Sequence, residues 1–159
     1  MRNRDRKLQV NVQRCVRSWA PHAREIAAWA GTALGRRAAG GELGVRVVGA
    51  AESRRLNTRY RGKDKPTNVL SFPTAPLPAA RSEAAAGRPL GDLVICAQVV
   101  RSEARAQRKP LKAHWAHLVV HGALHLIGYD HVREAQAKRM ERREIAVLRR
   151  LGFTNPYRI

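Results

Sequence analysis

Three histidines in HGALHLIGYDH (residues 121–131) have the residue type and the spacing needed to hold one metal ion. His121 and His125 are one helical turn apart, so both imidazoles project from the same side of a helix. Gly128 then allows a sharp turn, which lets His131 return to supply a third nitrogen. Three neutral imidazoles leave the fourth position of a tetrahedral zinc site for water, as in catalytic rather than structural sites. The spacing therefore predicts a catalytic metal centre.

The same spacing, H-x-x-x-H-x-x-G-x-x-H, occurs in the metzincin proteases, where a glutamate after the first histidine is the general base. In this chain that position is Gly122, so a metallopeptidase would lack its base. His114 and His117 fall outside the spacing, and we expect them to pack within the helix or to support the ligands from behind. For Asp130 two roles stay open, orienting an imidazole or water and stabilising the turn.

The chain is strongly basic, with 31 lysines and arginines against 12 acidic residues and a formal net charge of +19. Such an excess favours a polyanion as the partner. Six basic residues lie together before a predicted strand: Arg54, Arg55, Arg59, Arg61, Lys63 and Lys65. Aromatic residues are only 5% of the chain, which is too few for a platform that stacks successive bases. A metal-activated water beside positive charge indicates hydrolysis of a phosphodiester, with an arginine stabilising the phosphate oxygens.

Alternating strands and helices must position these groups. Period-two alternation or short apolar runs predict strands over residues 8–13, 43–49, 69–72 and 90–97. Helical spacing predicts helices over residues 21–39, 50–60, 98–108, 110–128 and 134–151. The fourth helix should carry one broad face with these residues: Leu111, His114, Trp115, Leu118, His121, Leu124 and His125. The order predicts an α+β fold in which helices cover one mixed sheet.

Length and composition exclude several other classes of protein. The 159 residues favour a single domain over residues 1–159, and 44% hydrophobic residues exclude disorder. No apolar run is long enough to span a membrane and the N-terminus lacks a secretory signal, so we expect a cytoplasmic protein. Cys15 and Cys96 should be reduced, with Cys96 buried. The segment between Pro73 and Leu90 lacks periodicity, and we expect a flexible flap there.

Four blocks follow one another along the chain: LNTRYRGKDKPTNVLSFP (56–73), LGDLVICAQVV (90–100), AHWAHLVVHGALHLIGYDH (113–131) and LGFTNPY (151–157). In these motifs and in their order the chain resembles the YbeY family, bacterial rRNA maturation factors described as metal-dependent, single-strand-specific endoribonucleases. The blocks and their connections cover most of the chain after residue 43. Residues 1–42 carry no motif that we match to the family.

The resemblance implies one divalent metal ion, zinc, on His121, His125 and His131, and a catalytic role for Arg61 in the YRGKD block. It implies that Arg61 projects toward the metal, and it implies a single metallohydrolase domain with about four strands in a mixed sheet and about five or six helices. It also implies maturation of the 3′ end of 16S rRNA and ribosome quality control. The implied partners are single-stranded RNA, the small ribosomal subunit, a small-subunit ribosomal protein and the Era GTPase.

Two questions stay open at this point. The nucleophile is either water on the metal or the RNA's own 2′-hydroxyl, because no carboxylate base is evident beside the histidines. The alternative function is a non-catalytic ribosome-assembly factor that binds rRNA and uses its metal only to brace the fold. The chain also departs in charge from the family that it resembles, since its last helix, KRMERREIAVLRR, is basic where members of that family tend to be acidic. We hypothesise stronger non-specific adhesion to RNA.

Overall fold

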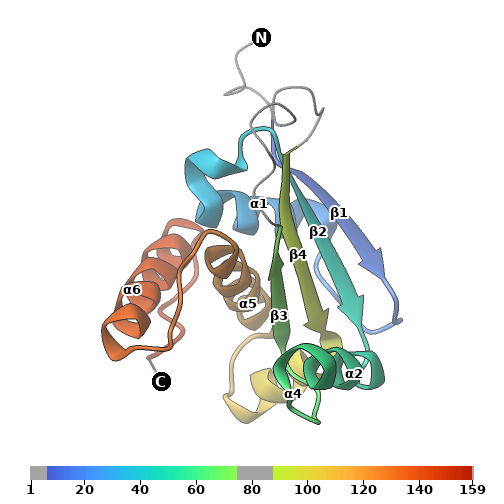
Figure 1. Cartoon of the computed structure of the whole chain (residues 1–159). Helices are drawn as coiled ribbons and strands as arrows, with labels where there is room; N and C mark the ends of the chain where they lie inside the picture. The colour runs from blue at the N-terminus through green and yellow to red at the C-terminus, as the bar shows by residue number, and fades with distance from the viewer. Residues whose placement is uncertain (1–6, 75–87, 159) are drawn as a thin grey trace.

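A four-stranded mixed sheet forms the centre of the structure (Figure 1), a computed structural model that describes residues 7–74 and 88–158. The strands are β1 (Gln9–Arg14), β2 (Gly41–Val48), β3 (Val69–Pro73) and β4 (Arg88–Cys96). Their order in the sheet is β1-β2-β4-β3; β2 pairs in parallel with β1 and β4, whereas β3 runs antiparallel to β4 at the edge. The predicted mixed sheet is therefore confirmed.

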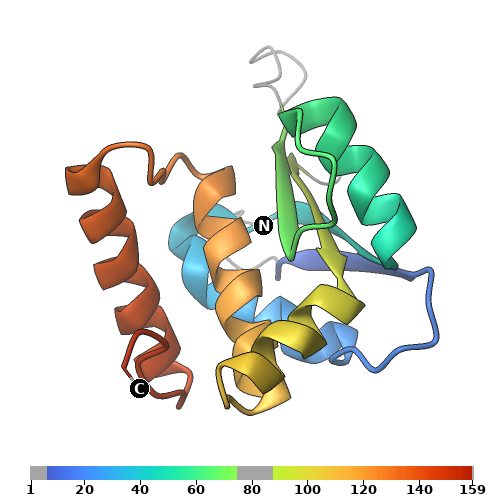
Figure 2. The same cartoon turned by 90° about the horizontal axis from the view of Figure 1, so that it is seen from below.

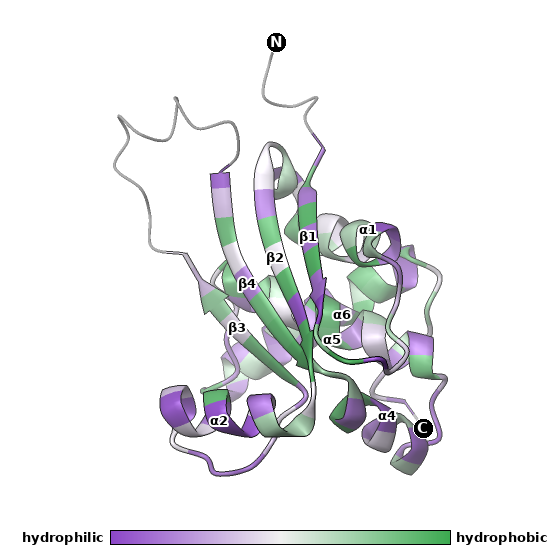
Figure 3. Ribbon diagram, turned by 90° about the vertical axis from the view of Figure 1, so that its right-hand side faces the viewer, coloured by the Kyte–Doolittle hydropathy of each residue, from purple (hydrophilic) through white to green (hydrophobic). Residues whose placement is uncertain are grey.

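Five α-helices accompany this sheet in the described residues, most of them on one face: α1 (Ala23–Leu34), α2 (Ala50–Arg61), α4 (Ala97–Ala106), α5 (Leu111–Leu126) and α6 (Glu134–Arg150). The helices α1 and α5 pack on one face of the sheet, and α6 packs on α5 (Figure 1). The helix α2 covers only one end of the opposite face, most of which Figure 3 shows without a covering helix. The predicted α+β architecture is thus the observed one.

Alternation along β2 explains why the two faces differ. Leu43, Val45 and Val47 point into the main core and are at most 2% exposed, whereas Glu42 and Arg46 lie on the other face. A smaller apolar cluster under α2 contains Val48, Leu70, Val94 and the buried, unpaired Cys96. Burial of Cys96 was predicted and is confirmed.

Two sequence predictions need correction. The helix expected over residues 21–39 is an α-helix only to Leu34, because Gly35 has a φ of +60° and the chain continues as a 3-10 turn, Gly35–Ala38. The helix α5 was expected to bury one broad face. It is instead buried on most sides, since Val119, Val120 and Ala123 are also 0% exposed between the sheet and the neighbouring helices. The histidine helix is therefore the central helix of the fold.

The helix α6 has one inward stripe and a basic outer surface. Met140, Val147 and Leu148 are buried, as predicted from their spacing, while its arginines are exposed. The flap predicted between Pro73 and Leu90 falls largely on residues 75–87, which lie outside the described residues. Among the helices that are described, none is long and apolar enough to cross a membrane.

Candidate metal centre

The turn at the end of α5 brings the third histidine back to the first two. The backbone N–H of Gly128 donates to the carbonyl of His125, and that of Tyr129 donates to the carbonyl of Leu124, each at 3.1 Å. This pair of bonds is a Schellman motif, and Gly128 takes the left-handed position in it with a φ of +100°. A side chain at that φ would be strained, so the glycine turn predicted from the sequence is confirmed.

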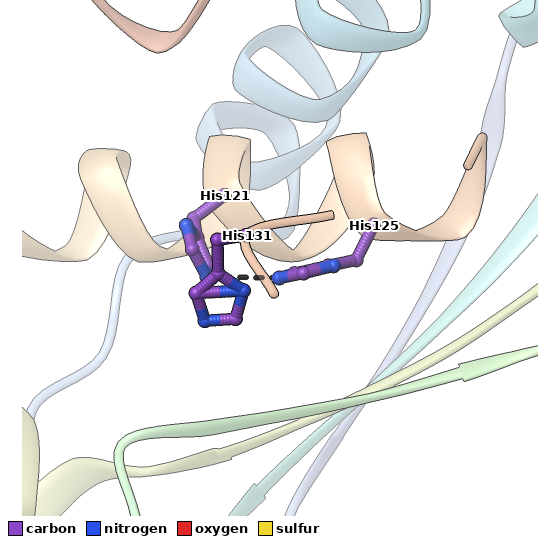
Figure 4. Close-up of side chains that lie close together, drawn as sticks. All are labelled: His121, His125 and His131. Atoms are coloured by element: carbon purple, nitrogen blue, oxygen red, sulfur yellow. Dashed lines mark hydrogen bonds between the residues drawn. The ribbon is translucent and has the colours of Figure 1, made fainter. Parts of the chain in front are cut away.

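The three histidine rings converge on one point (Figure 4). One ring nitrogen from each of His121, His125 and His131 lies within 4.8 Å of the other two. The Nε2 atoms of His121 and His125 are 3.1 Å apart. Two nitrogens bound to one tetrahedral zinc ion at 2.0–2.1 Å would be separated by about 3.3 Å. The residues thus fit a tetrahedral ion held by three nitrogens.

A buried carboxylate fixes the orientation of His121. The Nδ1 atom of His121 is 2.8 Å from Oε1 of Glu144, which lies on α6 and is 1% exposed. A carboxylate only accepts hydrogen bonds, so Nδ1 carries the proton and the neutral ring presents the lone pair of Nε2 to the metal position. No carboxylate beside the site was predicted from the sequence, and Glu144 is therefore an additional residue of the metal centre.

Two more side chains hold Glu144 in place. His117 Nε2 donates to Oε2 of Glu144 at 2.5 Å, and the hydroxyl of Tyr157 donates to the same oxygen at 2.6 Å. Burial alone would raise the pKa of Glu144, but the bonds from His117, His121 and Tyr157 outweigh it and lower the pKa to about 2. His117 therefore supports the ligands from behind, which is one of the two roles expected for it.

The other two ligands differ in their surroundings. Burial, together with the neighbouring His121 and His131, lowers the pKa of His125, which favours the neutral form that binds a metal. His131 is exposed on the loop before α6. Its backbone N–H donates to Oδ1 of Asp130 at 2.8 Å, and the same oxygen is 3.6 Å from its Nδ1. Asp130 therefore stabilises the turn.

Gly122 packs where a protease would carry its base. A Cβ atom at this position would lie 2.8 Å from Cδ2 of Leu93 on β4 and 3.3 Å from Oγ of Ser71 on β3. Leu93 is fully buried, and Ser71 also donates a hydrogen bond to the carbonyl of Gly122 at 3.2 Å. Position 122 thus faces the sheet, which leaves no room there for a glutamate. This packing argues against a peptidase of the metzincin type.

Arg61 is exposed at the last position of α2 and makes no hydrogen bond or ion pair to the histidines within the described residues. The edge strand β3 lies between α2 and α5 (Figure 2). Tyr60 packs edge-on against Phe72 of β3 with ring centroids 5.1 Å apart. The preceding residue, Ser71, points to the other side of β3 and bonds the carbonyl of Gly122 on α5, next to His121. The end of α2 and the metal centre are therefore on opposite sides of one strand.

Polar side chains of α2 hold the loop between α2 and β3, which carries part of the basic segment around Arg61. Asn57 is buried and donates to the carbonyl of Lys65 at 2.8 Å, while the buried Ser53 bonds the backbone of Thr67. Arg54 pairs with Asp64. Four cations in this segment form no ion pair with any residue that the structure describes: Arg59, Arg61, Lys63 and Lys65.

Comparison with known proteins gives three likenesses. Residues 1–152 match the family described as "Endoribonuclease YbeY", so the match includes the first 42 residues, where no motif was recognised. A curated Endoribonuclease YbeY from Halorhodospira halophila (strain DSM 244 / SL1) is 51% identical over 151 residues, covering 95% of this chain and 97% of that relative. A solution structure of a Thermotoga maritima protein aligns with a TM-score of 0.54 at 20% identity, over 95% of this chain and 100% of that one. The last likeness shows a common fold.

Proposed function

Because this chain belongs to the YbeY family of endoribonucleases, we propose that it is a metal-dependent enzyme that cleaves single-stranded RNA. The observation that carries the proposal is the convergence of one nitrogen each from His121, His125 and His131 on a point where a tetrahedral ion fits. Three imidazoles are the donor set of catalytic zinc sites, so zinc is the ion we propose. The whole chain, residues 1–159, then forms one metallohydrolase domain.

A divalent cation at this position supplies Lewis-acid chemistry, because it polarises phosphoryl oxygens and acidifies water. The chain's own groups prepare the site. Glu144 keeps the proton of His121 on Nδ1, and the buried side of α5 keeps His125 neutral. In this proposal the RNA crosses the edge of β3, which separates the end of α2 from the histidines. The cations at the end of α2 that form no ion pair with a described residue hold the RNA backbone, and the long side chain of Arg61 reaches around this edge to steady the oxygens of the scissile phosphate.

Arg61→Ala is the variant that tests this assignment. Cleavage of a labelled single-stranded fragment spanning the mature 3′ end of 16S rRNA should fall about 100- to 1000-fold, the usual loss when one charge-stabilising donor is removed. Metal content and thermal stability should stay unchanged, because Arg61 is exposed and bonds no described residue.

Arg142→Ala on the exposed face of α6 is the matched control, since it removes the same charge outside the basic segment at the end of α2. It should retain most of the cleavage, and identical purification of the three proteins controls for contaminating ribonuclease. Equal cleavage by all three, or cleavage by none, would contradict the role of Arg61 and favour an assembly factor. The chemical ends of the products identify the nucleophile, because a 2′,3′-cyclic phosphate forms only when the RNA's 2′-hydroxyl attacks.

The salt dependence of RNA binding tests the basic segment. Log affinity for single-stranded RNA falls by about 0.7 per phosphate neutralised for each unit of log salt, so four unpaired cations predict a slope of about −3. Replacing both Lys63 and Lys65 with glutamine should make the slope shallower by about 1.4. The pair Arg142→Gln and Arg149→Gln on the exposed face of α6 removes the same charge elsewhere. Equal slopes for the two double variants would contradict binding at α2.

The cellular setting follows from the same proposal. A cytoplasmic endoribonuclease of this kind acts on 16S rRNA at its 3′ end, within or beside the small ribosomal subunit, and takes part in ribosome quality control. Its protein partners would be a small-subunit ribosomal protein and the Era GTPase. In cells that depend on this chain, the Arg61→Ala variant should therefore accumulate 16S rRNA with an unprocessed 3′ end, measured by primer-based mapping of rRNA ends.

A further inference from the structure

A second polar group lies along α5 beside the metal centre. The carboxylate of Glu103 on α4 bonds Nε2 of His114 at 3.0 Å, and the side-chain amide of Asn68 donates to it at 3.1 Å. His114 is 4% exposed, whereas Glu103 keeps 32% of its side-chain surface exposed. The bond to His114 is the main cause that lowers the pKa of Glu103, so the group is an anion at neutral pH. The Oε1 atom accepts both bonds, whereas among the described residues Oε2 has one longer contact, 3.3 Å from the amide nitrogen of Asn68.

This carboxylate lines a cavity of about 300 Å³ that reaches the metal ligand His121. Other walls come from Gln107, His117, Pro156 and Tyr157. His114 and His121 are seven residues apart on α5, which is about 10 Å along the helix axis at 1.5 Å per residue. One end of the cavity is therefore lined by His121, one of the three histidines, and the other end by the carboxylate of Glu103.

The size and chemistry of the cavity suit one flat group with N–H donors. A phosphate is excluded from the Glu103 end by like charge, and the ammonium group of Lys109 is already bonded to the carbonyl of Pro156. The Tyr157 ring is 45% exposed and is fixed at its hydroxyl by Glu144 and at its edge by His117, with ring centroids 5.4 Å apart. Proteins read single-stranded RNA by stacking unpaired bases on such rings and bonding their edges.

We propose that this cavity, the base pocket, binds one unpaired base of the RNA substrate and selects guanine through Glu103. The inference rests on the proposed nuclease function and names a subsite for it. Guanine presents two adjacent N–H donors, on N1 and N2, to Oε2, the oxygen of Glu103 with spare acceptor capacity, whereas uracil presents a carbonyl oxygen on each side of its single N–H. Tyr157 stacks on the base. A base bound here places its own ribose and phosphate at the histidines.

Binding of mononucleotides tests the base pocket without any cleavage. In titration calorimetry with the metal-loaded protein, guanosine 5′-monophosphate should bind about tenfold more tightly than uridine 5′-monophosphate, the discrimination of one good paired contact. Glu103→Gln should abolish the difference, while Glu141→Gln, an exposed glutamate on α6, should keep it. Because loss of the His114 bond could unfold the first variant, Gln107→Trp provides a second test. Gln107 is exposed at the rim, and an indole there should block both nucleotides.

Cleavage of a randomised single-stranded RNA, with the product ends sequenced, gives the complementary result. The wild type should cut with guanine enriched at one fixed position from the break, and Glu103→Gln should cut without that enrichment. Cleavage with no base preference, together with equal affinity for the two nucleotides, would overturn the proposal that the base pocket selects guanine. The proposed nuclease function would still stand. Absence of cleavage by the wild type overturns the proposed function instead, and the calorimetry still decides whether the pocket binds guanine. A preference that survives in Glu103→Gln overturns the role of Glu103.

Discussion

Replacing His125 with alanine should abolish tight metal binding and lower RNA cleavage by about 1000-fold or more, because several kcal/mol of charge stabilisation disappear with the ion. His125 is the best ligand to remove. Its side chain lies against His121 and bonds no member of the Glu144 network other than that histidine among the described residues, so the substitution leaves the bonds to Glu144 intact. Substitution of His121 would also release Glu144 and mix two effects.

The measurement combines metal analysis of the purified protein with cleavage of the 16S fragment at fixed total zinc. Folding has to be measured beside activity, because a bound ion also stabilises the folded state by linkage. The apo forms of the wild type and the variant should therefore unfold at similar temperatures, whereas only the wild type should gain stability from zinc. Val132→Ala, a neighbouring residue with 82% exposure, is the control and should behave as wild type. Full activity of His125→Ala without metal would contradict a metal-dependent reaction.

Glu144→Ala should cause the largest loss of stability among the substitutions discussed here, about 3 kcal/mol or more in the free energy of unfolding. Its removal leaves the donors of His117, His121 and Tyr157 without their common acceptor inside the protein. The zinc affinity of the folded variant should also fall, by about 10- to 100-fold, because His121 is no longer held with its lone pair toward the metal.

Urea unfolding in the presence of a chelator measures the first effect, and competition with a chromophoric chelator measures the second. The variant Glu144→Gln separates the effect on stability from the effect on zinc affinity. Glutamine has nearly the same volume as glutamate, but its NH₂ group donates hydrogen bonds where one carboxylate oxygen accepted them. We expect it to recover part of the stability and little of the metal affinity. Glu141→Ala lies one turn earlier on α6, is exposed, and should change stability by less than about 0.5 kcal/mol. Equal behaviour of Glu141→Ala and Glu144→Ala would refute the role of the network.

The metal ligands were predictable because their geometry is local. Two histidines one turn apart and a glycine at the end of the helix fix the directions of His121, His125 and His131 within eleven residues of sequence. The sheet elements were predictable for the same reason, since period-two alternation is local. The order of the strands in the sheet was not predictable in this way, because it depends on pairing between strands that are distant in the sequence.

Glu144 escaped prediction because its partners are distant in sequence, at 27 residues for His117, 23 for His121 and 13 for Tyr157. A signal was nevertheless present. Glu144 is four residues after Met140 and three before Val147, so it interrupts the inward stripe of α6 with a charge. A buried carboxylate requires hydrogen-bond donors, and the histidines of the predicted neighbouring helix were the available ones.

The close packing at Gly122 also limits the evolutionary routes open to this scaffold. The metzincin spacing of its histidines suggests that exchanging one residue for glutamate would convert a nuclease into a peptidase. At position 122, however, the new side chain would first have to displace Leu93 from the core and Ser71 from its bond to α5. Such an exchange would strain the packing between α5 and the sheet before it created a new activity. Divergence between the two chemistries therefore requires the helix to move relative to the sheet, which many coordinated substitutions must accomplish together.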